Sequence, residues 1–285
     1  MTRVVYTNSP QLPLSRLLAP HRIVRDLLRH RELIVAYTRR EFQAAHRGTY
    51  LGLLWSVLSP LIMLALFAFV FGGIFGGKFN AKGHETPAEF ALALFVGLSF
   101  FNAFAQSMGS ASSLVLGSAA YVKSLAFPLE ILPLASVLNA LLNLMISLVI
   151  CLAAHLLMYG NLQWTVAWLA IHIACVALLG LGISWFLASL AVFVRDVPAV
   201  VGPINTVLMF CSGCFFPLSV MSPRMRALLE INPLAVIIDQ ARGCLMYGQG
   251  PDLVKLAYVL AFSLAFAVAG YAFFMKTKPA FADVM

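Results

Sequence analysis

Six long apolar stretches dominate the pattern of hydrophobic and polar positions along the chain. A helix needs about 20 apolar residues to cross a hydrocarbon core roughly 30 Å thick, and each stretch is long enough. Only short polar breaks separate some of them, such as residues 195–198 between the fourth and the fifth. The pattern predicts six transmembrane helices near residues 51–75, 90–113, 130–158, 165–193, 198–219 and 253–275.

The first 50 residues form a separate cytoplasmic segment in this reading, ahead of a six-helix transmembrane domain over 51–285. Within it, residues 21–47 predict an amphipathic helix that lies on the membrane surface, because apolar and charged side chains fall on opposite sides at helical spacing. The apolar side holds Ile23, Val24, Leu27, Leu28, Ile34, Val35 and Phe42, and the charged side holds Arg25, Arg29, Glu32, Arg39 and Arg40.

Residues 217–252 predict two short helices instead of a span. Ser222 and Asn232 each stand as a capping residue just before a proline, and Gly248 ends the second helix. Because neither helix is long enough to cross the bilayer, we expect a re-entrant helical hairpin on the outer side. The predicted fold class is therefore an all-α membrane protein with six spans, an interfacial helix and this hairpin.

Composition supports a membrane protein, because 61% of the residues are hydrophobic and only 11% are charged, against about 25% charged in a soluble domain. Nine of the 19 Lys and Arg residues precede position 50, and the loops at 77–89 and 220–252 are close to neutral. This bias predicts that both termini are cytoplasmic and that the basic segment lies against anionic lipids, with no role in binding nucleic acid.

The chemistry needed for ion coupling or catalysis is missing from the predicted spans. Their apolar cores hold no Asp, Glu, Lys or Arg, and no catalytic set or metal-spaced cluster converges at one depth. The five cysteines fit no zinc or disulfide pattern. Residues 72–78 match most of a phosphate-binding loop, but Phe79 replaces the hydroxyl that would hold Mg²⁺. We therefore expect no metal, cofactor or nucleotide site in this chain.

Polar stripes run along two of the spans. Asn102, Gln106 and Ser110 recur every four residues in the second span, as do Asn139 and Asn143 in the third. Side chains in such stripes face either the helix bundle, as structural glue, or a wet pathway, and both interpretations stay open here.

Four segments resemble the permease subunit of ABC-type polysaccharide exporters, the family that moves O-antigen, capsule and teichoic-acid chains. The first matching segment is Arg39-Arg40-Glu41 followed by Arg47-Gly48-Thr49-Tyr50-Leu51-Gly52-Leu53-Leu54-Trp55, then Pro60-Leu61 and Val70-Phe71-Gly72. The others are Lys123-Ser124-Leu125-Ala126-Phe127-Pro128-Leu129-Glu130-Ile131-Leu132-Pro133, Phe193-Val194-Arg195-Asp196-Val197, and Asn232-Pro233-Leu234 with Arg242 beyond it. They occur in the expected order and cover most of the chain.

The resemblance implies a homodimer bound to two copies of a separate cytoplasmic ATPase, which would hold ATP and Mg²⁺. It implies that the link over 114–129 contacts the ATPase, with Tyr121, Lys123, Phe127, Pro128 and Glu130 as candidate coupling residues. It also places the first and fifth spans at the pore, which makes aromatic side chains of these spans pore-lining candidates. These are Trp55, Phe67, Phe71, Phe75, Phe210, Phe215 and Phe216.

The sequence as a whole is similar to a permease, not an enzyme, in the bacterial inner membrane that exports a lipid-linked polysaccharide. Further candidate site residues are Arg39, Arg40, Glu41 and Arg47 of the interfacial segment and Asn232, Pro233 and Arg242 of the outer hairpin. Two alternatives remain: an ABC-type exporter of a small lipophilic compound, and a membrane-embedded glycan or lipid enzyme.

Overall fold

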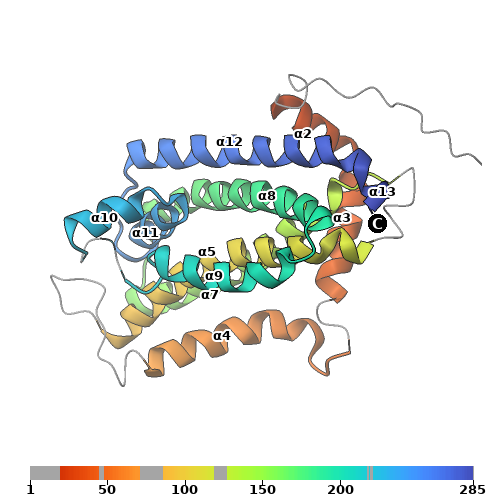
Figure 1. Ribbon diagram of the computed structural model, residues 1–285. Helices are drawn as coiled ribbons and strands as arrows, with labels where there is room; N and C mark the ends of the chain where they lie inside the picture. Colours follow the sequence, from red (N-terminus) through yellow and green to blue (C-terminus); the bar gives the residue numbers. More distant parts are fainter. Residues whose placement is uncertain are drawn as a thin grey trace, which may run out of the picture.

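The computed structural model describes residues 20–44, 48–70, 86–118, 127–216, 218 and 221–284, and this part of the chain is helical without strands (Figure 1). Five helices in it are long and apolar enough to cross a membrane, so the chain is a multi-pass membrane protein. Their bounds are Gly52–Val70, Pro87–Leu114, Ile131–Tyr159, Trp164–Phe193 and Leu253–Ala280.

The labelled elements within these spans follow the chain. They are η1 (Gly52–Leu54), α4 (Trp55–Phe67), α5 (Pro87–Leu114), α7 (Ile131–Tyr159), η4 (Trp164–Trp168), α8 (Leu169–Phe193), α12 (Leu253–Thr277) and η6 (Lys278–Ala280). The shorter elements are α2 (Pro20–Arg29), α3 (Arg31–Ala44), η3 (Leu116–Ser118), α9 (Val197–Cys211), α10 (Pro223–Glu230), α11 (Pro233–Met246) and α13 (Phe281–Val284).

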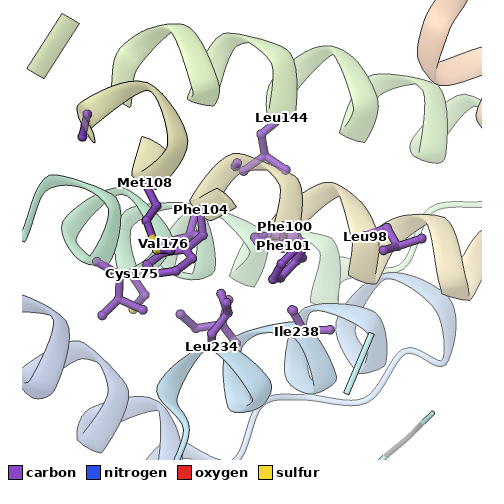
Figure 2. Close-up of a cluster of buried hydrophobic side chains, with 14 of the residues drawn as sticks. Leu98, Phe100, Phe101, Phe104, Met108, Leu144, Cys175, Val176, Leu234 and Ile238 are labelled. Carbon is purple, nitrogen blue, oxygen red and sulfur yellow. The ribbon is translucent and has the colours of Figure 1, made fainter. Parts of the chain in front are cut away.

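Helix α5 is the centre of the bundle and contacts α4, α7, α8, α9 and α11. It begins after a capping box, in which Thr86 accepts a hydrogen bond from the Glu89 amide and the Glu89 carboxylate accepts one from the Thr86 amide. Its Phe100 and Phe101 are buried in a cluster with Leu144 of α7 and Leu234 of α11 (Figure 2). The short helix α11 therefore packs into the bundle instead of lying beside it.

Helices α8 and α12 pack backbone against backbone. A Cβ atom added at Gly270 would lie 2.3 Å from the Gly182 carbonyl oxygen, so neither helix tolerates a larger side chain at this crossing. Trp185 and Tyr271 meet edge to face beside it, with ring centroids 5.1 Å apart. Small residues that bring two helices together in this way are typical of packing within membranes, where burial of apolar surface gives little driving force.

The two ends of the bundle carry different elements (Figure 1). At one end α3 crosses the bundle and packs on α7, close to α13 and the C-terminal end of the chain. The other end holds α10 and α11, together with the starts of α5 and α12. Helices α2 and α3, the first that the structure describes, thus lie at the same end of the bundle as α13.

Four predicted spans agree closely with α5, α7, η4–α8 and α12, but other segments differ from expectation. Helix α9 ends at Cys211, and Gly213 follows with a φ of 65°. Its 15 residues extend about 22 Å, short of a bilayer core. The predicted surface helix over 21–47 is broken at His30 into α2 and α3. Of its predicted apolar side, Ile34 is buried whereas Val35 is exposed.

Candidate functional site: a cavity with an amide-lined wall

A cavity of about 500 Å³ lies between α4, α5, α7 and the C-terminal end of α9, with Phe215 just after it. Its polar lining residues are Ser59, Ser99, Asn102, Gln106, Asn143 and Ser147. Its apolar lining residues are Pro60, Met63, Phe67, Phe95, Leu98, Ala103, Ala140, Leu144, Met209 and Phe215. The described lining carries no charged side chain, so the cavity offers neutral hydrogen-bonding groups beside aromatic and aliphatic ones.

The two polar stripes found in the sequence meet along this cavity. The Asn143 Nδ2 donates to Gln106 Oε1 at 3.1 Å, which joins α7 to α5 through two carboxamides. Toward the α3 end, the hydroxyls of Ser110 and Ser136 lie 2.5 Å apart. The stripes therefore do both: their side chains join α5 to α7 through hydrogen bonds, and some of them also line the cavity. Below, the row of Asn102, Gln106 and Asn143 along this contact is called the seam.

Asn102 stands apart from the rest of α5. It is the one exposed residue in the continuously described stretch from Phe90 to Ser112, and its neighbours Phe101 and Ala103 are buried. It lies about 20 Å from either end of the helix, near the middle of the span. A free carboxamide in hydrocarbon costs several kcal/mol, so this side of α5 must face something polar.

The aromatic candidates divide into three groups. Phe67 and Phe215 line the cavity. Trp55, Phe210 and Phe216 are exposed, and the Phe210 ring stacks on Phe215 with centroids 5.4 Å apart. Phe71 and Phe75 lie outside the described residues.

The candidate coupling residues are described only at the end of their link. Tyr121 and Lys123 lie outside the described residues, whereas Phe127 and Pro128 are half-buried. The Glu130 carboxylate accepts a hydrogen bond from Lys278 Nζ at 2.6 Å, and its main-chain oxygen accepts one from Trp185 Nε1 at 3.2 Å. The start of α7 is thereby tied to α8 and to the C-terminal turn.

The interfacial candidates lie on α3, apart from Arg47, which is outside the described residues. Arg39 and Arg40 are exposed, and the Arg40 guanidinium lies 5.9 Å from the centroid of the Tyr37 ring. Glu41 is half-buried, and burial raises the pKa of its carboxyl above the ordinary value. The charged face predicted for this helix is thus present, with one carboxyl turned inward.

The outer candidates hold the end of α9 in place. Asn232 caps α11 by accepting from the Leu234 amide at 3.0 Å, and its Nδ2 donates to the Cys211 carbonyl at 3.1 Å. Pro233 is the first residue of α11. Arg242, only 2% exposed, donates to the carbonyls of Ala93, Gly213 and Cys214.

Some contacts of these sites carried no usable sequence signal. Lys278 pairs with a carboxylate 148 positions away. Arg242 was a candidate from the resemblance, but its packing against Gly97 was not predicted: a Cβ atom at Gly97 would lie 2.3 Å from Arg242 Nη2. Asn205 of α9 donates to the Ala105 carbonyl at 3.3 Å, which fixes α9 beside the cavity. A polar residue within an apolar run was the only available hint for Asn205.

Comparison with known proteins identifies similar chains. Residues 32–246 match the protein family described as ABC-2 type transporter. The chain is 26% identical over 268 residues to an O-antigen export system permease protein RfbA of Myxococcus xanthus, which covers 92% of this chain and 98% of the relative. Two proteins of the same name from Klebsiella pneumoniae are each 24% identical over 258 residues, or 89% of this chain and 95% of each relative.

Proposed function

This chain belongs to the ABC-2 type transporter family, and on that premise we propose that it is the permease subunit of an ATP-driven polysaccharide exporter. Its substrate is a lipid-linked chain of O-antigen or capsule type, which it carries across the bacterial inner membrane. It is a transport subunit without catalytic residues, metal or cofactor of its own, and ATP with Mg²⁺ binds to a separate partner.

The relatives carry the proposal, because proteins named O-antigen export system permease match nearly the whole chain. The cavity supports it chemically. Sugars present hydroxyl groups at their edges and C–H groups on their ring faces, and the cavity offers carboxamides and hydroxyls beside Met63, Phe67 and Phe215. A small lipophilic substrate would leave the uncharged polar groups of the cavity without hydrogen-bond partners.

A second copy of the chain is the proposed partner in the membrane. No residue of the Gly52–Val70 span is buried, and large apolar side chains of α9 are also exposed, among them Val207 and Phe210. Because α4 and α9 are the least covered helices of the bundle, they are the natural faces for a symmetric dimer with a pore between subunits. The exposed Trp55, Phe210 and Phe216 would then line or border that pore.

Two copies of a cytoplasmic ATPase complete the proposed assembly. The end of the bundle with α3, the start of α7 and the C-terminal turn faces the cytoplasm in this arrangement, so both termini are cytoplasmic. Helix α9 is shorter than a full span, and together with the turn that follows it we count it as the sixth crossing. The link over 114–129 contacts the ATPase there. The Glu130–Lys278 pair supports this role, because it would pass a displacement of the link to α8 and α12. At the other end, α10 and α11 form the re-entrant hairpin.

The test is to delete the gene and follow the glycan. We expect lipid-linked polysaccharide to accumulate on the cytoplasmic side of the inner membrane, and a plasmid copy of this chain to restore its appearance at the cell surface. Restoration should fail in cells that lack the partner ATPase. Normal surface glycan in the deletion strain, or turnover of a glycan or lipid substrate by the isolated chain, would contradict the proposal.

A further inference from the structure

On the basis of the proposed function, we infer that Asn102, Gln106 and Asn143 form a carboxamide site that binds hydroxyl groups of the polysaccharide near the bilayer centre. The site belongs to one subunit, on the wall shared by α5 and α7. The ligand class is a neutral stretch of carbohydrate, recognised by amides and not by charge.

The hydrogen bonds of these side chains are only partly used. Asn143 Nδ2 donates to Gln106 Oε1, which orients both carboxamides. Among the residues that the structure describes, the Asn102 carboxamide, Gln106 Nε2 and Asn143 Oδ1 have no hydrogen-bond partner. Free donors and free acceptors therefore lie along one seam, which suits a hydroxyl group, since it both donates and accepts.

The position of the seam excludes lipid as its occupant. Asn102 is exposed near the middle of α5, the most buried of the candidate spans that the structure describes, where an acyl chain would leave its carboxamide without a partner. Water can fill the cavity between transport events, because it satisfies the same groups. A passing sugar hydroxyl replaces that water without losing hydrogen bonds.

The opposite wall sets the orientation of the ligand. Met63 and Phe67 of α4 and Phe215 after α9 line the same cavity, and the apolar face of a pyranose ring can lie against them. A volume of about 500 Å³ lies within the range of roughly 300–1,000 Å³ typical of small-molecule sites. The cavity therefore fits a short stretch of glycan, with hydroxyls toward α5 and α7 and ring faces toward α4.

The test is photo-cross-linking in the complete complex with its ATPase. The photoreactive residue p-benzoylphenylalanine replaces Asn102, and in a matched control it replaces Val149, which is 60% exposed on α7 and does not line the cavity. The probe is a polyprenyl-diphosphate-linked polysaccharide labelled in the same cells with a tritiated monosaccharide. We expect labelled adducts from position 102 and at least tenfold less label from position 149.

Substitutions give a second readout. Asn102→Leu is expected to slow export roughly three- to tenfold, the effect of losing one neutral hydrogen bond, and Asn102→Ser to restore part of it. Val149→Leu should leave export unchanged. Co-purification of the ATPase shows whether each variant assembles.

The outcomes distinguish a failure of the proposed function from a failure of the carboxamide site. If the unsubstituted chain exports no glycan, the proposed function is wrong. If it exports glycan but position 102 cross-links only to lipid or to a second copy of the chain, the carboxamide site is wrong. The site is equally excluded if Asn102→Leu assembles and exports at the normal rate.

Discussion

Helices α4 and α8 are almost equally apolar, yet they differ in how much of each is buried within the subunit. None of the residues in the span that contains α4 is buried, whereas 39% of an 18-residue apolar stretch in the span that contains α8 is buried. What distinguishes α8 is the set of small residues along it, such as Gly182, Ser184 and Ala188, which allow α12 and α5 to approach. Hydropathy therefore selects the segments that enter the membrane, whereas small residues decide which of them pack inside the subunit.

This contrast divides the molecule into a packed side, formed by α5, α8, α11 and α12, and an open side, formed by α4 and α9 (Figure 1). The packed side holds its residues through close contact and buried hydrogen bonds. On the open side, apolar faces are available to contact lipid or a second subunit. The amide-lined cavity lies at the border between the two sides.

The largest expected effect comes from truncating one phenylalanine on the packed side, and the comparison is the same substitution on the open side. Phe100 of α5 is fully buried, so Phe100→Ala should destabilise the protein by about 3–5 kcal/mol. Phe210 of α9 is 63% exposed, and Phe210→Ala should change stability by less than about 0.5 kcal/mol. Unfolding in detergent, followed by circular dichroism, measures both. Equal losses would show that α9 is packed as tightly as α5.

Removal of the buried guanidinium is next in size. Arg242→Leu leaves the carbonyls of Ala93, Gly213 and Cys214 without this donor, at an expected cost of about 3 kcal/mol. The control is Arg226→Leu, since the Arg226–Glu230 pair at 2.8 Å is largely exposed and should contribute under about 1 kcal/mol. If the Tm of Arg242→Leu equals that of the control, Arg242 does not anchor α11 to α5 and to the turn after α9.

A single methyl group tests the helix crossing. Gly270→Ala places its Cβ against the Gly182 carbonyl and should cost about 2 kcal/mol, because the two backbones must separate. Gly202→Ala in α9 meets no atom within 4 Å and should be neutral or slightly stabilising. The yield of monodisperse protein and its Tm report both effects. Tolerance of alanine at position 270 would contradict the close crossing.

The smallest effect concerns the Glu130–Lys278 ion pair, at the end of the bundle where we propose that the ATPase binds. Lys278 is partly exposed, although Glu130 is largely buried, so a double-mutant cycle with Glu130→Gln and Lys278→Met should give a coupling free energy of roughly 1 kcal/mol. We expect each single variant to hydrolyse ATP in the complex with less export per ATP. A coupling energy near zero together with unchanged export would exclude the pair from coupling.

Much of the fold could be predicted from the sequence because the lengths of its apolar runs match the thickness of a bilayer. The ends of α5, α7, α8 and α12 follow from it, as does the capping of α11 by Asn232. The end of α9 did not follow, because the apolar run continues beyond Cys211 although Gly213 turns the chain. The break at His30 likewise falls within one periodic pattern.

The candidate site was predictable only in part. The stripes containing Gln106 and Asn143 were visible as polar positions at helical spacing, but their mutual hydrogen bond depends on how α5 and α7 rotate about their axes. The exposure of Asn102 depends on where α4 and α9 stand, and no periodicity within α5 encodes that. Tertiary packing therefore decides which polar residues act as glue and which line the cavity.

The most direct test asks whether the cavity between the packed and the open side is accessible to water during transport. In a background without the five native cysteines, Asn102→Cys and Ala188→Cys are exposed to a membrane-impermeant thiol reagent while the complex exports glycan. Asn102 is exposed toward the cavity, whereas Ala188 is fully buried in the packed side. We expect labelling at position 102, reduced when glycan fills the cavity, and none at position 188. Labelling absent at both positions in a complex that still exports would contradict it.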